Sequence, residues 1–555
     1  MPNIQITQTL KTDLLIVGSG IGGLSCSVEA HKKGINHILI TKTQLGSGAS
    51  FFPLKASLGI QVTGDEHDKA LFQQDIERVA QGMNNPEIVK AYIEDSPQAV
   101  ELLNEIGFCP WKRNDNRPAC FAKHARPIYL INEWQKARKN AEAIIAQQNT
   151  TTLFENASLV HIATENHRVV GAVFAYQNPE KSGRKIVYFY VQTSAIILAS
   201  GGIAGLYKDN LYPADVIGST HFLALQAGAR LTNLEFIQFI PSFIAPKYKV
   251  LFGEHTLKYC TAVMDKNGNS LFPDLSAEEF AQMMAERSAY APFSVDFDCV
   301  KFDLRIMQYL LENPEEQGVY LHYSPKLYQD QTEFYRVYLD WLKADAGIDL
   351  LTDRVSIAPF AHSCNGGIEI DTNAESAVQG LFAVGELSSC IEGANRLGGN
   401  SVGGSLVFAK RAMAKIQQDL TVCSASVINE QAVENAKNFA EQALNCLHNE
   451  NADNMLTASQ VLSEIRQAMT KFANVYRTEE NLCKLQEKLA RLEQDFDPIE
   501  NADFQGIEIF YGLKTAQAVV NAMLARKESR GAHYRADYPE KSERSYRQMT
   551  SKMIN

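Results

Sequence analysis

The sequence Asp13–Gly23, DLLIVGSGIGG, decides the fold. Asp13–Val17 is a short, mostly apolar run that is typical of a buried strand. Leu24–Lys33 then has helical spacing, and Ile38–Thr41 is a second apolar run. A strand, a glycine-rich turn, a helix and a second strand make up the unit that binds a pyrophosphate at the helix N-terminus. The sequence therefore predicts a Rossmann-type dinucleotide site, whose candidate cofactor-binding residues in the turn are Gly18, Gly20, Ile21, Gly22 and Gly23.

The end of the second predicted strand bears on which dinucleotide is bound. The acid that commonly binds the adenosine ribose of NAD at this place is missing, and Thr41-Lys42 stands there instead. This favours an FAD whose adenosine end is held in another way. The small-residue loop Gly46–Ser50 follows, and it fits either a phosphate contact or an ordinary surface turn.

A second glycine-rich stretch, Gly385–Val402, reads GELSSCIEGANRLGGNSV. It follows the apolar run Gly380–Val384 and brings one acid, one cation and two amides into a turn-rich segment, namely Glu386, Arg396, Asn395 and Asn400. Between the two stretches, the predicted strand Ala195–Ala199 runs into Ser200-Gly201-Gly202, which suits another close approach of the backbone to a cofactor. We expect the two distant stretches to hold two ends of one FAD, and the second to carry part of the substrate site.

The bulk composition bounds the class of protein. A chain of 555 residues is expected to hold more than one domain. Its net charge of −11 argues against a nucleic-acid partner, which needs a basic surface. The sequence has no apolar run near the roughly 20 residues that span a bilayer and no signal-peptide pattern at its start. We therefore expect a cytoplasmic protein without a membrane span.

The ten cysteines are scattered along the chain, and none stands in a CxxC pair. Their spacing gives no sign of an iron–sulfur cluster, a c-type haem or a structural zinc site. We therefore predict no metal site, and free thiols are the expectation in a reducing compartment.

The remaining patterns predict the domain organisation. Arg168–Tyr176 and Lys185–Gln192 alternate on either side of a turn, which predicts a β-hairpin. From Leu234 to about Asp349 prolines and aromatics are frequent and predicted strands are short, which indicates an inserted domain. From about Ser426 to Arg526 strong helix formers recur at helical spacing. The predicted fold class is α/β, with a Rossmann-type FAD-binding domain at 1–235 and 351–420, an inserted α+β capping domain at 236–350 and a C-terminal helical domain at 421–555.

Six motifs in order along the chain carry a family resemblance. They are GSGIGG at Gly18, LASGGI at Leu198, EFIQFIPS at Glu235, HSCNGGI at His362, GLFAVGELSSCIEGANRLGGNSV at Gly380 and ESRGAHYRADYP at Glu528. Through them the chain resembles, along nearly its whole length, the flavoprotein family of L-aspartate oxidase and of the flavin subunits of succinate dehydrogenase and fumarate reductase. The resemblance implies an FAD that lies extended over the first domain, with its pyrophosphate near Gly18–Gly23.

The resemblance also assigns further residues to the cofactor. Glu386 would bind the ribose–ribityl end, and the helix start at Asn400-Ser401-Val402 would face the pyrimidine side of the flavin. A helix N-terminus there stabilises the negative charge that reduced flavin carries. No histidine lies in Gly46–Leu58, where the respiratory subunits attach flavin covalently, so we expect non-covalent FAD. The other candidate cofactor-binding residues are Thr41, Lys42, Gly48, Ala49, Ser50, Gly59, Ile60, Ser200, Gly201 and Gly202.

By the same resemblance, the substrate lies between the flavin and the capping domain. His362 and Arg396 match the residues that hold a substrate carboxylate, which the planar guanidinium binds bidentately. Arg287 is assigned to the arginine that donates or accepts a proton opposite the hydride transfer, and Glu254 to the acid beside it. These four residues are the candidate catalytic set.

Departures from the family pattern concern the substrate. The second carboxylate-binding histidine is replaced by Ile240, and an expected arginine by Leu257. A charge-assisted hydrogen bond is worth about 1.5–3 kcal/mol, so a compact dianion such as fumarate should bind poorly unless Lys258 or His255 compensates. A substrate with one carboxylate and one less polar end fits better. A further departure replaces the family's Thr-Gly-Asp-Gly by Ile217-Gly-Ser-Thr220.

Functions of different classes remain open at this point. The first is a self-contained, L-aspartate-oxidase-like or fumarate-reductase-like oxidoreductase that transfers hydride between FAD and a small carboxylate or amino acid, with O2 or another electron acceptor. The alternative is a flavoprotein subunit of a multi-subunit electron-transfer complex with a redox partner protein. A third is an FAD-binding protein without catalysis. The substrate, the reaction direction, the acceptor and the oligomeric state stay open.

Overall fold

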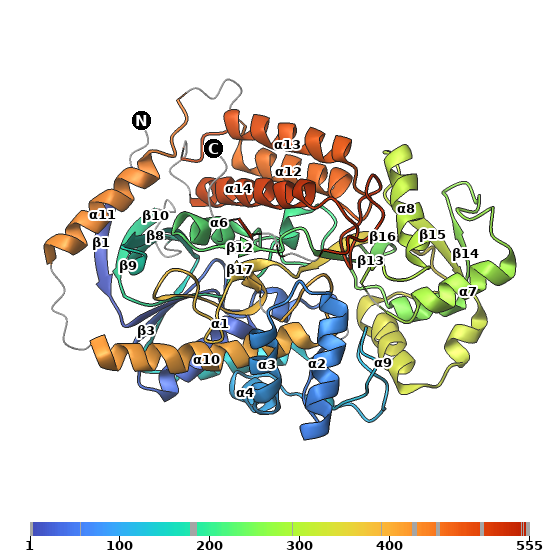
Figure 1. Cartoon of the computed structure of the whole chain (residues 1–555), viewed down its shortest axis with the longest axis horizontal. Coiled ribbons are helices and arrows are strands. Elements are labelled where there is room, and N and C mark those ends of the chain that lie inside the picture. The colour runs from blue at the N-terminus through green and yellow to red at the C-terminus, as the bar shows by residue number, and fades with distance from the viewer. Residues whose placement is uncertain are drawn as a thin grey trace.

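The structure is a computed structural model, shown in Figure 1. It describes residues 4–55, 57–177, 186–290, 292–389, 391–423, 430–450, 456–499, 504–544, 547, 549 and 550. The predicted α/β class is confirmed: parallel strands and helices form the centre, and a layer of helices contributed by the C-terminal part of the chain covers one side (Figure 1).

The central sheet has five parallel strands in the order β18-β11-β2-β3-β7. Their bounds are Leu381–Ala383, Ile196–Leu198, Leu14–Val17, His37–Thr41 and Thr151–Glu155. β2, β3, β11 and β18 consist of buried residues, as expected for parallel strands covered on both faces. The predicted strand–turn–helix–strand unit is present, because α1 (Ile21–Lys32) connects β2 to β3.

The two glycine-rich stretches meet on one side of this sheet. The first begins α1, and the second begins α10 (Asn400–Cys423). The two helices pack against each other, although nearly 400 residues separate their starts. Residues far apart in the sequence are therefore brought to a common edge of the sheet.

A second sheet, β1-β10-β9-β8, flanks the first. It contains Ile6–Lys11, Ile186–Gln192, Arg168–Gln177 and Ala157–Glu165. β9 and β10 are antiparallel neighbours, so the predicted hairpin is confirmed. The smaller sheets are β4-β6-β5 (Leu58–Gln61, Ile128–Ile131, Trp111–Lys112) and β19-β17-β12-β20 (Ser388–Ser389, Gly367–Glu369, Leu231–Thr232, Met549–Thr550).

The first part of the chain contributes further helices. They are α2 (Glu66–Ala80), α3 (Pro86–Asp95), α4 (Ala99–Glu105) and α5 (Trp134–Ala146). α3 starts as expected, since Asn85 caps it by accepting a hydrogen bond from the Glu87 N–H and Pro86 occupies the first turn. α10 packs against both α3 and α4.

The capping region forms one end of the molecule (Figure 1). Its antiparallel sheet runs β13-β16-β15-β14, with bounds Ile237–Ala245, Ser356–Cys364, Val319–Tyr323 and Cys260–Met264. Its helices are α7 (Ala277–Arg287), α8 (Val300–Glu312) and α9 (Glu333–Trp341). β16 joins this sheet although it follows residue 350, where the inserted domain was expected to end. The domain boundaries stay predictions.

The C-terminal helices α12 (Ala458–Phe472), α13 (Glu479–Gln494) and α14 (Phe504–Ala525) pack against one another. α11 (Glu430–Asn445) lies apart from them, against β8 and β9. α14 is apolar on nearly all sides and packs on α6 (Ser219–Gln226), so it is an internal helix. Among the described residues, no helix has both the length and the apolar content needed to cross a bilayer.

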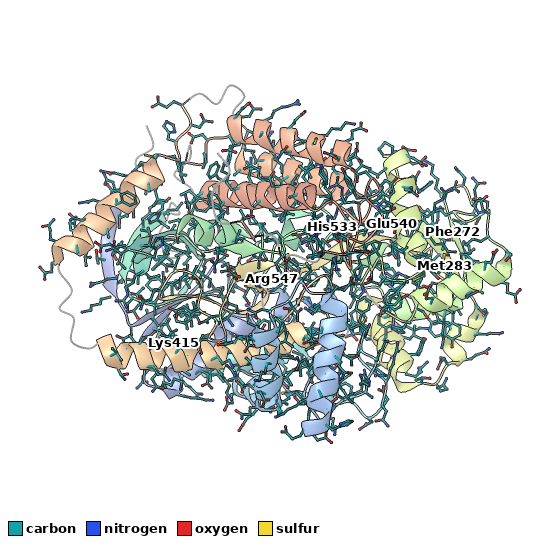
Figure 2. All side chains as sticks on the ribbon, viewed as in Figure 1. Phe272, Met283, Lys415, His533, Glu540 and Arg547 are labelled. Carbon is teal, nitrogen blue, oxygen red and sulfur yellow. The ribbon has the colours of Figure 1, made fainter. Side chains whose placement is uncertain are left out.

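The tail that follows α14 passes between the helical layer and the capping region, where Figure 2 labels His533. Arg526 lies 2.5 Å from Glu235, and both side chains are fully buried. Ala532 donates a backbone hydrogen bond to Ala394 (2.8 Å), and Val295 donates one to Gly531 (2.9 Å). The tail thus contacts both the FAD-binding part of the chain and the capping region.

Candidate active site

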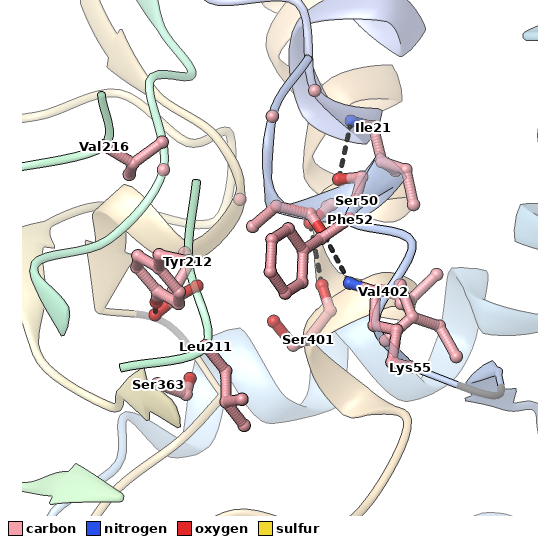
Figure 3. Close-up of a pocket in the computed structure, with 18 of the residues that line it drawn as sticks. Ile21, Ser50, Phe52, Lys55, Leu211, Tyr212, Val216, Ser363, Ser401 and Val402 are labelled. Carbon is pink, nitrogen blue, oxygen red and sulfur yellow. Dashed lines mark hydrogen bonds between the residues drawn. The ribbon is translucent and has the colours of Figure 1, made fainter. Parts of the chain in front are cut away.

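A cavity of about 470 Å³ opens at the carboxyl ends of β2, β3, β11 and β18. This edge of a parallel sheet is where ligands bind in open α/β folds. Figure 3 shows its wall, to which the first part of the chain contributes Ile21 and Lys55, the middle Tyr212, and the second glycine-rich stretch Ser401 and Val402. The capping region closes the far side.

The glycine turn has the geometry of a phosphate cradle. Gly18 has φ +105°, and a Cβ there would lie 2.4 Å from the carbonyl oxygen of Ala199. A Cβ at Gly23 would lie 1.8 Å from the carbonyl oxygen of Gly18. Both positions therefore require glycine. Gly20 instead lines the cavity, and an added Cβ would meet nothing within 4 Å except the Ser50 hydroxyl oxygen.

The loop Gly46–Ser50 belongs to the cavity wall, which favours the first of its two sequence interpretations. Ser47, Gly48, Ala49 and Ser50 all line the cavity. The Ser50 hydroxyl accepts a hydrogen bond from the N–H of Ile21 (3.2 Å), which ties this loop to the first turn of α1. The loop and the glycine turn therefore face the same space, as a pyrophosphate site requires.

Most of the candidate cofactor residues line this cavity. They are Gly18, Gly20, Ile21, Gly22, Thr41, Lys42, Gly48, Ala49, Ser50, Gly59, Ser200, Gly201, Glu386, Ser401 and Val402. The other four do not line it and pack behind its wall: Gly23, Ile60, Gly202 and Asn400. For all the candidate residues, those four included, contact with a cofactor stays a prediction.

Glu386 lies inside the cavity wall. Its Oε1 accepts a hydrogen bond from the Cys364 N–H (2.9 Å) and another from the Tyr212 hydroxyl. Burial raises the pKa of Glu386 to about 7, against the opposing effects of the Cys364 N–H and of Arg396. Burial makes the charged form of this carboxylate unfavourable, and hydrogen bonds to the charged form stabilise it. Glu386 is therefore suited to accept hydrogen bonds from the hydroxyl groups of a ligand.

His362 and Arg396 are brought together from β16 and the second glycine-rich stretch. Arg396 Nη2 lies 3.4 Å from His362 Nε2, and its Nε donates to the Gln238 side-chain oxygen (3.1 Å). Burial, together with the charges of Arg396 and Lys55, lowers the pKa of His362 to about 3. The imidazole is therefore neutral at pH 7 beside a guanidinium that Gln238 holds in place.

Lys55 is a cavity residue that the sequence reasoning missed. Its Nζ donates to the Ala49 carbonyl oxygen and lies 5.4 Å from the centre of the Trp134 ring. Burial lowers the pKa of Lys55 to about 7, and the charge of Glu386 opposes this effect. One sequence signal existed, because Lys55 is the one charged residue in the stretch 47–64.

The cap side of the cavity bears on whether Lys258 or His255 compensates for the lost cations. Lys258 does not line the cavity, and its Nζ lies 3.3 Å from Asp330. His255 does line it, but its ring is enclosed by Tyr335 and Tyr338, with centroids 4.9 Å away in each case. Burial lowers the pKa of His255 to about 3, so it adds no charge at pH 7. Neither residue replaces the missing cations.

Of the four candidate catalytic residues, Glu254, His362 and Arg396 line the cavity and Arg287 does not. α7 ends at Arg287, and its guanidinium is held by Asp303 of α8, with Nε 2.7 Å from Oδ2 and Nη2 3.1 Å from Oδ1. Nη1 donates to the Tyr290 carbonyl oxygen (2.7 Å). This differs from the expected position in the substrate site, because a buried carboxylate on the neighbouring helix captures the side chain.

Fold and cavity together define an α/β protein with a cavity at the carboxyl edge of its parallel sheet, of the kind that dinucleotide-binding proteins have. Residues 13–402 match the model of the FAD binding domain, and residues 462–554 match that of the fumarate reductase flavoprotein C-terminus. The chain belongs to the family of this FAD binding domain, and with it to the FAD-dependent oxidoreductases. The predicted family and cofactor are thereby confirmed, whereas the mode of attachment of FAD is not tested.

Relatives match along nearly the whole chain. The fumarate reductase flavoprotein subunit of Escherichia coli is 26% identical, over 96% of this chain and 89% of its own length. The L-aspartate oxidase of Bacillus subtilis is also 26% identical, over 95% and 92%. A solved quinol-fumarate reductase with menaquinol molecules superposes with a TM-score of 0.77 at 22% identity and covers 99% of each chain, which shows the common fold.

Proposed function

We propose that this protein transfers hydride between non-covalently bound FAD and a small molecule with one carboxylate and one less polar end. The observation that carries this proposal is the pairing of His362 with Arg396 in the cavity wall, 3.4 Å apart, beside the apolar side chains of Ile240 and Leu211. Both named relatives support an oxidoreductase of amino or carboxylic acids. The sequence feature that supports non-covalent attachment is the lack of a histidine in 46–58.

The carboxylate would bind between His362 and Arg396. Arg396 donates its Nε to Gln238, which orients the guanidinium and directs its Nη groups toward His362. A carboxylate placed there accepts charge-assisted hydrogen bonds from the guanidinium. Its negative charge also favours the protonated form of His362, whose pKa burial and the charges of Arg396 and Lys55 hold near 3. Lys55 adds a second positive group whose charge reaches both His362 and Glu386.

The wall on either side of His362 is unsuited to a second carboxylate. Ile240 and Leu211 line the cavity and belong to one small apolar cluster with Ala358 and Phe360. A carboxylate placed against these side chains would lose its hydration without gaining an ionic partner, which is costly. An aliphatic, aromatic or amide end is free of this cost. The cavity therefore fits a monocarboxylate or an amino acid better than fumarate or succinate.

FAD bound in the cavity supplies the hydride donor or acceptor. The protein supplies position and electrostatics: the N-terminus of α10 at Ser401 and Val402 directs its positive dipole end into the cavity. Closure of the capping region over the cavity would exclude water from the transfer.

The proton that accompanies the hydride needs a group on the cap side. We keep Glu254 and Arg287 for this role. Glu254 lines the cavity, and burial raises its pKa. Arg287 stands behind it, close enough for its charge to oppose that rise. Glu254 would exchange the proton with the substrate, and Arg287 would set its proton affinity.

Anaerobic bleaching of the bound flavin by a panel of acids tests the proposal. Monocarboxylic and amino acids should reduce the flavin, whereas succinate and L-aspartate should do so poorly. Readmitted air then separates an oxidase, which reoxidises at once, from a dehydrogenase or reductase. An Ile240→His variant, which restores a cationic group on the apolar wall, should shift preference toward dicarboxylates. Efficient turnover of succinate, fumarate or L-aspartate by the unmodified protein would sink the proposed substrate class.

A flavoprotein subunit of a larger electron-transfer complex is the second candidate. The observation that favours it is that the E. coli relative is named as a subunit. Purification of the tagged chain from its own cells, with iron and acid-labile sulfide assayed in the eluate, distinguishes the two. A stoichiometric iron–sulfur partner would support the subunit, and a catalytically active single chain the first candidate. The cytoplasmic location stays a prediction, which fractionation of the same cells tests.

A further inference from the structure

The adenosine half of FAD needs a partner that the second strand of the sheet does not provide. In Rossmann-type sites an acid at the end of that strand binds the ribose hydroxyls. Here β3 ends in Thr41, whose hydroxyl accepts a hydrogen bond from Ser19 (2.9 Å). Thr41 and Lys42 nevertheless line the cavity, so the ribose position itself is present.

We propose that Glu508, on the C-terminal helix α14, binds the ribose hydroxyls of the adenosine half of FAD. This inference rests on the FAD site and is independent of the proposed substrate. Glu508 lines the same cavity as Lys42. Its Oε2 lies 2.9 Å from Lys42 Nζ, and its Oε1 accepts a hydrogen bond from the Ser158 hydroxyl. A carboxylate from another domain thus stands beside the end of β3.

The surroundings of Glu508 come from three distant segments of the chain. Lys42 Nζ also donates to the carbonyl oxygen of Asp215 (3.0 Å), and Asp215 lines the cavity. Ser158, next to the start of β8, lines it as well. The end of β3, the start of β8 and the loop before α6 therefore converge on one carboxylate.

α14 holds Glu508 rigidly against the cavity. One turn further along, the Tyr511 hydroxyl donates to the carbonyl oxygen of Val160 in β8 (2.9 Å). Another turn on, the Thr515 hydroxyl donates to the carbonyl oxygen of Gly218 (3.0 Å), just before α6. These anchors join α14 to two of the segments that surround Glu508, so its position does not depend on a flexible loop.

The chemistry of Glu508 suits a diol. It is the one acid in α14, where Lys514 is the one other charged residue, and it is 2% exposed. Burial of a carboxylate is costly unless it is paired and hydrogen-bonded. Lys42 forms an ion pair with Oε2, but Oε2 accepts no well-aligned hydrogen bond from the described residues. A carboxylate has about four acceptor sites, which leaves capacity for two ribose hydroxyls.

Titration of deflavinated full-length protein with FAD and with ADP-ribose tests the proposal. Glu508→Gln should weaken both by about 10- to 150-fold, the value of one charge-assisted hydrogen bond. Its affinity for FMN, which lacks the adenosine half, should not change. The matched control is Glu493→Gln, because Glu493 also pairs with a lysine (Lys514, 2.7 Å) on the C-terminal helices but does not line the cavity.

An FAD analogue with 2′,3′-dideoxyadenosine separates ribose binding from a structural role. The unmodified protein should bind the analogue more weakly than FAD, by about the same factor as the Glu508→Gln change weakens FAD binding. The Glu508→Gln variant should bind the analogue less than about threefold more weakly than it binds FAD. Equal losses for both proteins, or unchanged FAD binding by Glu508→Gln, would overturn the proposal. The double change Lys42→Met with Glu508→Met removes the buried ion pair as a unit. It keeps the test valid if the single variant folds poorly.

Discussion

Replacement of Gly20 by alanine should separate cofactor binding from folding. Gly20 has φ −72° and ψ −172°, which any residue can adopt, and a Cβ there meets only the Ser50 hydroxyl oxygen at 3.4 Å. Alanine in place of glycine reduces the conformational entropy of the unfolded chain, which stabilises the folded protein by about 0.4–1 kcal/mol. Alanine is also a poorer helix N-cap than glycine, which destabilises the folded protein by a similar amount. The free energy of unfolding of the apoprotein should therefore change by less than about 1 kcal/mol.

The same Cβ projects into the space where a pyrophosphate approaches the backbone. The loss of one charge-assisted hydrogen bond costs about 1.5–3 kcal/mol, which corresponds to roughly 10- to 150-fold weaker FAD binding. Quenching of flavin fluorescence measures this affinity, and urea unfolding of the apoprotein measures stability.

Gly23→Ala is the contrasting variant. Its Cβ would lie 1.8 Å from the Gly18 carbonyl oxygen, so α1 must move away from β2, at a cost of about 1–3 kcal/mol or more. Gly34→Ala is the control for backbone strain alone, because Gly34 has φ +67° and nothing lies within 4 Å of its added Cβ. Our reading of the turn fails if Gly20→Ala unfolds as readily as Gly23→Ala, or if it binds FAD as tightly as the unmodified protein.

Three further predictions concern charge. The affinity for a simple carboxylate, followed by flavin absorbance, should fall as pH rises through about 7, where Lys55 loses its proton, and Lys55→Met should flatten that profile. Arg396→Lys removes the fork that binds a carboxylate bidentately, and KM should rise at least about tenfold. Arg526→Met leaves Glu235 buried without its partner and should lower the free energy of unfolding in urea by about 3–5 kcal/mol, whereas the exposed Arg491→Met should change it by less than about 0.5 kcal/mol.

The central fold was predictable because its signals are local. β2, the glycine turn and α1 are consecutive, and each follows from the spacing of apolar residues and glycines within about ten positions. The β9–β10 hairpin is equally local. The limits of the capping region were harder to predict. β16 pairs with both β13 and β15 across more than a hundred and about forty residues respectively, and strand periodicity does not reveal such partners.

The site residues that lie in recognisable motifs could be predicted from the sequence. Single charged side chains outside such motifs were harder to predict. His362 and Arg396 lie in recognisable motifs and do meet. Arg287 was assigned by the family resemblance alone, and the sequence gives no means of knowing that Asp303 on another helix holds it. Lys55 and Glu508 belong to no motif. Each is a lone charge in an apolar stretch, a pattern that signals a special environment without saying which one.

The C-terminal part of the chain is thereby involved in both ends of the cavity. At one end Glu508 of α14 pairs with Lys42 beside β3. At the other, the tail donates a hydrogen bond from Ala532 to Ala394, two residues before Arg396, and Gly531 fits there because a Cβ would lie 2.4 Å from the Ala394 carbonyl oxygen. The stretch Gly385–Val402 is therefore held in place by contacts with a segment that is more than a hundred residues away in the sequence. A displacement of the helical layer would disturb the adenosine end and the carboxylate end together, so cofactor binding and substrate binding should be coupled through it.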